Sequence, residues 1–102
     1  MAEKNPEELV PIELLIKILH DKIEPRNYSI EDINKDTFIL KELGADSLHE
    51  YEITYAFDSE FGIDLEDEEW SDWRGYIVGT RPELDYTVGD LHEFLIEQKK
   101  KQ

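Results

Sequence analysis

The chain has 102 residues, and its 26 acidic side chains against 11 Lys and Arg give a formal net charge of −15 at pH 7. So large an excess of negative charge disfavours nucleic acids and anionic membrane surfaces as partners and favours basic proteins. The absence of cysteine excludes disulfides, zinc–thiolate sites and a thiol nucleophile supplied by the chain itself. Length and a hydrophobic content of 39% predict a single domain over residues 1–102, with a modest core at about residues 7–98.

The sequence carries no signal for a membrane span or a secretory leader. Its longest apolar stretch, around residues 12–19, is interrupted by Glu13 and Lys17. The first eight residues contain three glutamates and lack the apolar core of a signal peptide. We therefore expect a cytoplasmic protein that does not insert into membranes.

Helical periodicity begins close to the N-terminus. Apolar residues recur at helical spacing over residues 9–23, which predicts a helix that starts near Asn5 and ends before Pro25. Pro11 also allows a start one turn later. A long connection over residues 24–46 follows, and its apolar pattern predicts one short helical turn at residues 36–43.

A second strong helix is predicted from Ser47 to Phe61, because Gly62 supplies a C-cap directly after the last apolar residue. A short helix over residues 66–70 comes next. Residues 71–86 contain two Gly and one Pro, which predicts an irregular insert rather than a further helix.

The last helix begins at Thr87, where Asp90 completes a capping-box-like pair. Its inward-facing residues are Val88, Leu91, Phe94 and Leu95. Residues 99–102 are expected to be a frayed tail. Since no segment shows the alternation of a strand, the predicted fold class is all-α, a small helical bundle.

The helix over residues 47–61 has two apolar faces, whereas a surface helix of a small monomer normally has one. One face is formed by Ile53, Phe57 and Phe61, which we expect in the core. The other consists of Leu48, Tyr51 and Tyr55, and acids lie beside both faces at Glu50, Glu52, Asp58 and Glu60. The second face either packs under the 71–86 insert or docks a partner, and periodicity does not decide between these interpretations.

The helix is entered through the motif LGADSL at residues 43–48, in which Ser47 has two interpretations. Ser47 and Glu50 match the S-x-x-E capping box, so the serine could serve only to cap the helix. Alternatively, Ser47 is an attachment point, because a phosphate on its oxygen would lie at the positive end of the helix dipole. His49 faces elsewhere on the helix and cannot act as its base, so Ser47 fits an acceptor better than a catalytic nucleophile.

These motifs together resemble a family. The LGADSL motif, the acidic helix ending at Phe61, the acids at residues 67–69 and the closing YTVGDL at residues 86–91 are similar to acyl carrier proteins. The resemblance is strong over residues 43–69 and 86–96 and weaker over residues 9–40. It implies a four-helix bundle in which Ser47, framed by Asp46 and Leu48, receives 4′-phosphopantetheine from coenzyme A through a separate phosphopantetheinyl transferase.

The resemblance also implies a role. The thiol of the phosphopantetheine arm holds acyl groups as thioesters, and the carrier, itself no enzyme and expected to be a monomer, delivers them to acyl-loading and acyl-transferring enzymes. The basic patches of those enzymes are implied to dock on the acidic helix over residues 47–61. The implied docking residues are Leu48, Glu50, Tyr51, Glu52, Tyr55, Asp58 and Glu60.

The sequence departs from the family pattern in three places. His49 replaces an acid, Tyr51 and Tyr55 replace smaller aliphatic residues, and the 71–86 insert is longer than the usual link to the last helix. Four large side chains in and next to this insert either cover the core, line an acyl cavity or contact a dedicated partner: Trp70, Trp73, Tyr76 and Ile77. These departures favour a specialised carrier in lipid, lipopolysaccharide or secondary-metabolite assembly.

Two other functions remain open from the residues alone. One is an unmodified acidic adaptor that uses only the docking helix; the other is a metal-binding regulator. The second has weak support, because His20, His49 and His92 are dispersed and Ile63 stands where a calcium-binding loop requires glycine. We therefore predict no metal site.

Overall fold

The computed structural model describes residues 6–101, with side chains from residue 8 onward. Pro11 divides the expected first helix into α1 (Pro6–Leu9) and α2 (Ile12–Ile23), because proline has no N–H for a helical hydrogen bond and here serves as the N-cap of α2. The α2 helix ends at Ile23, as predicted. The predicted start at Asn5 lies outside the described residues.

The connection from α2 to α3 contains a 3₁₀ turn, η1 (Ile30–Asp32). Its strand-like pairing, within residues 6–101, is limited to an isolated antiparallel bridge between Phe38 and Thr87. The bridge places the connection against the start of the last helix, and the chain has no sheet over the described range.

The short helical turn predicted within this connection is present as a single hydrogen-bonded turn, in which the Glu42 N–H donates to the Phe38 carbonyl at 3.1 Å. No helix forms because the intervening donors are used elsewhere. The N–H groups of Leu40 and Lys41 donate to the buried Asp85 carboxylate at 2.9 and 2.8 Å. Asp85 thereby fixes the loop to the segment that precedes the last helix.

The α3 helix (Ser47–Phe61) has the predicted bounds, and Gly62 ends it in the left-handed conformation, with φ of 67°. The α4 helix (Asp67–Gly79) is far longer than predicted, so most of the expected irregular insert is helical. Gly75 is tolerated in its interior although glycine costs about 1 kcal/mol there. Trp70 and Trp73, one turn apart, offset this cost by packing on the bundle.

The α5 helix (Val88–Lys100) begins at the predicted capping box: the Asp90 N–H donates to the Thr87 hydroxyl oxygen at 3.1 Å, and the Thr87 N–H donates to the Asp90 carboxylate at 2.8 Å. The expected frayed tail is wrong for Lys99 and Lys100, which are helical. Lys99 Nζ donates to the Phe61 carbonyl at 2.7 Å and so satisfies the C-terminal end of α3.

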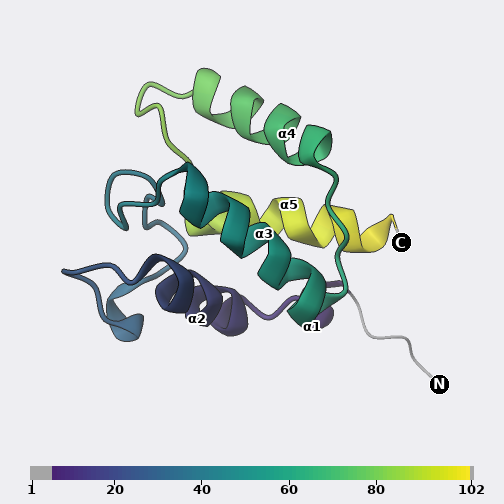
Figure 1. The fold of residues 1–102 in the computed structure, drawn as a ribbon, viewed down its shortest axis with the longest axis horizontal. Helices are drawn as coiled ribbons and strands as arrows, with labels where there is room; N and C mark the ends of the chain where they lie inside the picture. The colour runs from purple at the N-terminus through teal and green to yellow at the C-terminus, as the bar shows by residue number, and fades with distance from the viewer. Residues whose placement is uncertain (1–5, 102) are drawn as a thin grey trace.

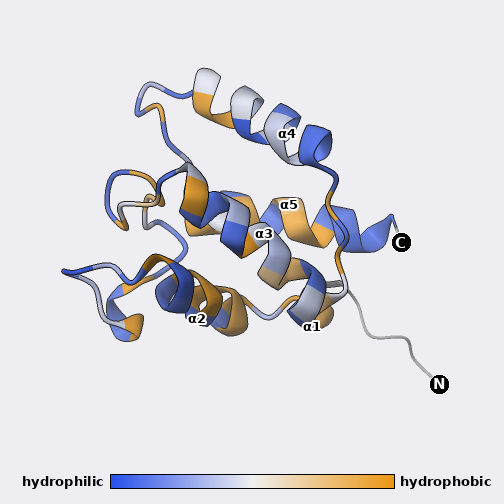
Figure 2. Ribbon diagram, viewed as in Figure 1, coloured by the Kyte–Doolittle hydropathy of each residue, from blue (hydrophilic) through white to orange (hydrophobic). Residues whose placement is uncertain are grey.

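The helices α2, α3 and α5 enclose the core, and α4 lies across one side of this group (Figure 1). Figure 2 shows hydrophobic residues on the facing sides of α2, α3 and α5. The fully buried aliphatic and aromatic residues are Val10, Leu15, Leu19, Ile39, Ile53, Phe57, Ile63, Tyr86, Val88, Leu91 and Leu95. No helix among the described residues is long and apolar enough to cross a membrane. The fold is the expected small all-α bundle, and residues 6–101 contain four helices of twelve or more residues.

The α4 helix packs differently from the other three long helices, because it contributes no fully buried residue. Its two indole rings cover the core instead: Trp73 stacks on Phe94 with ring centroids 4.5 Å apart, and Trp70 meets Tyr86 edge to face at 6.0 Å. Of the three roles left open for the residues of this region, covering the core is confirmed for these two and for Ile77, which is partly buried against the core. Tyr76, in contrast, is 69% exposed.

Candidate functional site

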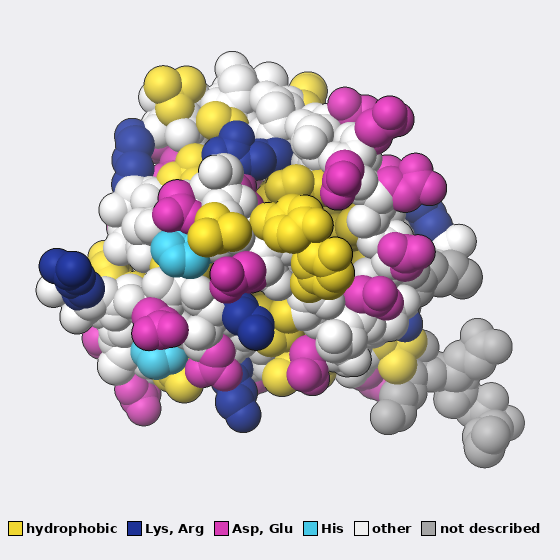
Figure 3. Space-filling model, viewed as in Figure 1, with side chains coloured by type: hydrophobic (Ala, Val, Ile, Leu, Met, Phe, Trp, Pro, Cys, Tyr) yellow, Lys and Arg dark blue, Asp and Glu magenta, His cyan; other side chains and the backbone are white. Residues whose placement is uncertain are grey.

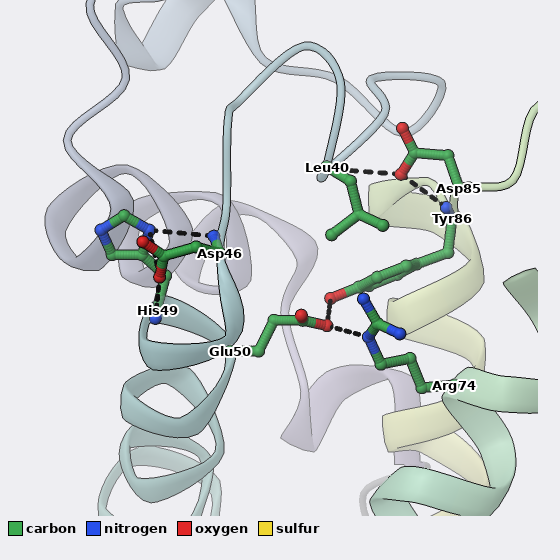
Figure 4. Close-up of polar contacts among 7 residues, drawn as sticks. All are labelled: Leu40, Asp46, His49, Glu50, Arg74, Asp85 and Tyr86. Atoms are coloured by element: carbon green, nitrogen blue, oxygen red, sulfur yellow. Dashed lines mark hydrogen bonds and ion pairs between the residues drawn. The ribbon is translucent and has the colours of Figure 1, made fainter.

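Asp46, and not Ser47, is the N-cap of α3. The Asp46 carboxylate accepts from the His49 N–H at 2.9 Å, and His49 Nδ1 accepts from the Asp46 N–H at 3.2 Å (Figure 4). The hydrogen bond from the His49 backbone lowers the pKa of Asp46. The predicted capping box between Ser47 and Glu50 is therefore wrong, since its place is taken by the pair one residue earlier.

Ser47 is consequently the first residue of α3, and its side chain has no capping role. It is exposed, and its hydroxyl makes no hydrogen bond to any group in the described part of the chain. The first N–H groups of a helix lack intrahelical acceptors and carry the positive end of the helix dipole. The hydroxyl thus lies where an attached anion is stabilised.

Glu50 is a second correction, because it is 5% exposed and does not contribute to the surface charge. Its carboxylate accepts from the Tyr86 hydroxyl at 2.8 Å and from Arg74 Nε (Figure 4). The hydrogen bond to Glu50 raises the pKa of Arg74, and burial raises the pKa of Tyr86. The three side chains join α3, α4 and the segment before α5 through one polar network, in which Glu50 and Tyr86 are buried and Arg74 is partly exposed.

The second apolar face of α3 is exposed. Leu48, Tyr51 and Tyr55 are 63%, 52% and 64% exposed, which rules out the interpretation that they pack under the 71–86 segment. Tyr51 and Tyr55 meet edge to face with ring centroids 5.1 Å apart and a hydrogen bond between their hydroxyls. Figure 3 shows hydrophobic side chains gathered over α3 with acidic groups around them. We call these three residues the α3 apolar face.

The acids beside this face fall into two groups. Glu52, Asp58 and Glu60 are exposed, as the docking interpretation requires, and Glu50 is withdrawn into the network described above. His49, which replaces an acid in the family pattern, is committed to the α3 cap. The exposed acids beside the α3 apolar face therefore place fewer negative charges close to Ser47 than the sequence predicts.

A groove of about 390 Å³ begins at Ser47 and runs between α3 and α4. Residues of both helices line it, together with one from the link between them: Ser47, Tyr51, Leu65, Trp70, Ser71 and Arg74. Arg74 is absent from the site residues predicted from the sequence, because it lies in the segment that was expected to be an irregular insert. The sequence feature that could have indicated it is that Arg74 is the one basic residue within the acidic stretch of residues 64–80.

The histidines and the remaining acids of the described residues are the side chains to consider as metal ligands. Within residues 8–101, no group of three or more His, Asp or Glu side chains is placed to hold a metal ion. His20 lies beside Asp21, and His92 Nε2 contacts the Val10 carbonyl at 2.7 Å.

Comparison with known proteins identifies the family, although no family model matches the chain. An acyl carrier protein of Treponema denticola is 31% identical over 70 residues, which cover 69% of this chain and 74% of that protein. Acyl carrier proteins of Petrotoga mobilis and Rickettsia bellii are 35% and 38% identical over 57 and 55 residues, covering 56% and 54% of this chain and 67% and 60% of theirs. The chain belongs to the acyl carrier protein family.

Proposed function

We propose that this protein carries acyl or related intermediates as thioesters on a 4′-phosphopantetheine arm attached to Ser47. The observation that carries the proposal is the Ser47 hydroxyl, which is exposed, free of hydrogen bonds within the described chain and placed at the first residue of α3. The arm supplies the thiol that a chain without cysteine lacks. The protein itself acts as a carrier and not as a catalyst.

The residues around Ser47 fit such a group. Asp46 holds the start of α3 rigid through its cap, so the hydroxyl is presented at a fixed position. The free N–H groups of the first helical turn favour the negative charge of a phosphodiester. Leu48, directly after the serine, is 63% exposed and gives a transferase an apolar contact beside the reacting hydroxyl.

The partners are a phosphopantetheinyl transferase and acyl-handling enzymes that dock on the α3 apolar face. Its exposed tyrosines suit arginine-bearing surfaces, which pack on aromatic rings and also pair with acids. The rim acids Glu52, Asp58 and Glu60 supply that charge. Because the face is more aromatic than the family pattern, we propose a dedicated set of enzymes in lipid, lipopolysaccharide or secondary-metabolite assembly.

The attachment is tested by intact mass. Purified protein is incubated with coenzyme A, Mg²⁺ and a broad-specificity phosphopantetheinyl transferase. We expect wild type to gain the mass of one phosphopantetheine, Ser47→Ala to gain none, and Ser59→Ala, which alters an exposed serine on the same helix, to behave as wild type. A folded wild type that gains no mass contradicts the proposal and favours an unmodified acidic adaptor.

The specialised role has its own test. The modified protein is offered to purified enzymes of ordinary fatty-acid elongation beside a housekeeping acyl carrier protein. We expect these enzymes to turn this carrier over more slowly, because Tyr51 and Tyr55 stand in the docking face. Equal turnover of the two carriers refutes the specialisation and leaves the carrier role intact.

A further inference from the structure

A groove of about 420 Å³ runs between α4 and α5, on a different side of α4 from the groove beside Ser47. The two grooves share no lining residue, and the α4 residues that line them are centred about 90° apart around the helix. A molecule bound between α4 and α5 therefore leaves Ser47 and the α3 apolar face accessible.

The two walls of the α4–α5 groove differ in character. On α4, the partly buried side chains of Trp73 and Ile77 form an apolar wall. Tyr76, which is 69% exposed, lies beside Trp73 on the same helix and extends this wall toward solvent. On α5, three acids line the facing wall: Asp90, Glu93 and Glu97. A ligand that fills the groove needs an apolar side and a basic side.

Two of the three acids are available to such a ligand. Asp90 accepts from Arg81 at 2.6 Å and is part of the α5 cap. Glu93 is exposed and makes no hydrogen bond or ion pair in the described part of the chain, and Glu97 makes an exposed contact of 3.4 Å with Lys100. Glu93 and Glu97 are separated by about 6 Å along α5, close to the distance of about 6.6 Å between alternate side chains of an extended chain.

Gln98 supplies the observation that points to a peptide backbone. Its side chain is 9% exposed and lines the groove, and its amide makes no hydrogen bond in the described part of the chain. No fully enclosed polar side-chain atom among the described residues lacks a partner, so this amide reaches the surface of the groove. One residue of an extended chain presents an N–H and a C=O that match the amide, whereas the backbone groups of a helix bond to each other.

The charges of the chain disfavour other occupants of the groove. A second copy would bring a further formal charge of −15, and an anionic membrane surface is repelled in the same way. An acyl chain offers no cation to Glu93 and Glu97 and no hydrogen-bond partner to Gln98. Lys101, which lines the groove beyond Glu97, repels a third basic residue.

We propose that the α4–α5 groove binds an extended segment of a partner protein with the order basic, apolar, basic. The two basic side chains pair with Glu93 and Glu97, and the apolar side chain between them packs on the α4 wall. The backbone of the segment bonds to the Gln98 amide. A partner held here stays attached while other enzymes use Ser47, and the site does not depend on the modification of that serine.

The test titrates the full chain, with and without the phosphopantetheine arm, with the peptide acetyl-Gly-Arg-Leu-Arg-Gly-amide at low ionic strength. The control peptide, acetyl-Gly-Leu-Arg-Arg-Gly-amide, has the same composition and charge, but its adjacent arginines point to opposite sides of an extended chain. We expect the first peptide to shift the NMR signals of the Gln98 amide and the Trp73 indole N–H. It should bind roughly five-fold more tightly than the control, the effect of one additional ion pair.

Matched variants locate the bound peptide. Glu93→Gln/Glu97→Gln should abolish the preference between the two peptides. Glu52→Gln/Asp58→Asn, which makes the same change of charge at exposed positions of α3, should keep it.

A modified peptide tests the contact with Gln98. Methylation of the leucine nitrogen removes the backbone N–H, so it should weaken binding to wild type and have little effect on binding to Gln98→Met. The comparison of the two peptides on wild type remains decisive if Gln98→Met does not fold.

Each of the other outcomes overturns the proposal. Equal affinity of the Arg-Leu-Arg and Leu-Arg-Arg peptides shows that charge alone explains the binding, and no binding at millimolar peptide shows that there is no site. A preference that survives in Glu93→Gln/Glu97→Gln, or shifts confined to the α3 apolar face, places the peptide elsewhere. Gln98 signals that move with protein concentration alone place a second copy in the groove. None of these results affects the carrier role, which the mass measurement on Ser47 tests separately.

Discussion

Replacing Arg74 by methionine is the sharpest test of the network that attaches α4 to the bundle. The variant leaves the Glu50 carboxylate, which is 5% exposed, with the Tyr86 hydroxyl as its remaining partner. Removing one member of a buried ion pair typically costs about 3–5 kcal/mol of unfolding free energy. Since the Arg74 side chain is 34% exposed and solvent screens the pair, we discount this loss to about 2 kcal/mol, or roughly 10 °C in Tm for a chain of this size.

The measurement is urea unfolding followed by far-ultraviolet circular dichroism. Glu50→Gln/Arg74→Met removes both charges and keeps a hydrogen-bonding side chain, so we expect it to recover at least half of the loss. Arg26→Met, at an exposed position in the α2–α3 connection, should stay within about 0.5 kcal/mol of wild type. The reasoning fails if Arg74→Met is as stable as Arg26→Met, or if the double variant is no more stable than the single one.

The two helix caps give further predictions. Because hydrogen bonding lowers the pKa of Asp46 in the folded state, its stabilising effect is present above its ordinary pKa and is lost as the pH falls through the lowered value. Asp46→Asn keeps a cap that does not titrate, so the acid-induced loss in urea unfolding should be smaller; an unchanged pH profile contradicts this role. Thr87→Ala should destabilise the protein by about 1 kcal/mol, and Thr87→Ser should restore most of the loss. Equal stability of the alanine and serine variants would argue against the cap.

The bounds of α3 and the start of α5 were predictable because their signals are local. Gly62 ends α3, and the capping box of Thr87 and Asp90 starts α5, through contacts with residues only a few positions away in the sequence. The helical spacing of Ile53 and Phe57 follows from the helical period alone. The break at Pro11 is local as well, but the apolar pattern continues through it, and pattern alone favoured one helix.

The errors over α4 and Glu50 have a different cause, because both depend on segments that are distant in the sequence. The length of α4 is set by Trp70 and Trp73 packing on Phe94 and Tyr86, and the glycines in its sequence gave the opposite indication. Glu50 is buried because Arg74 and Tyr86 reach it from 24 and 36 residues away. That same engagement keeps the Glu50 carboxylate away from Ser47, and the local Asp46–His49 cap takes the place of the predicted box.

Both tryptophans of the chain, Trp70 and Trp73, lie on α4 and pack over the bundle. Tryptophan emission therefore reports whether α4 is packed on the bundle, and it responds little to changes elsewhere in the other helices. An emission-monitored unfolding curve will coincide with one recorded by circular dichroism only if α4 detaches together with the rest. If the tryptophan emission changes at a lower urea concentration than the circular dichroism does, α4 detaches while α2, α3 and α5 remain assembled.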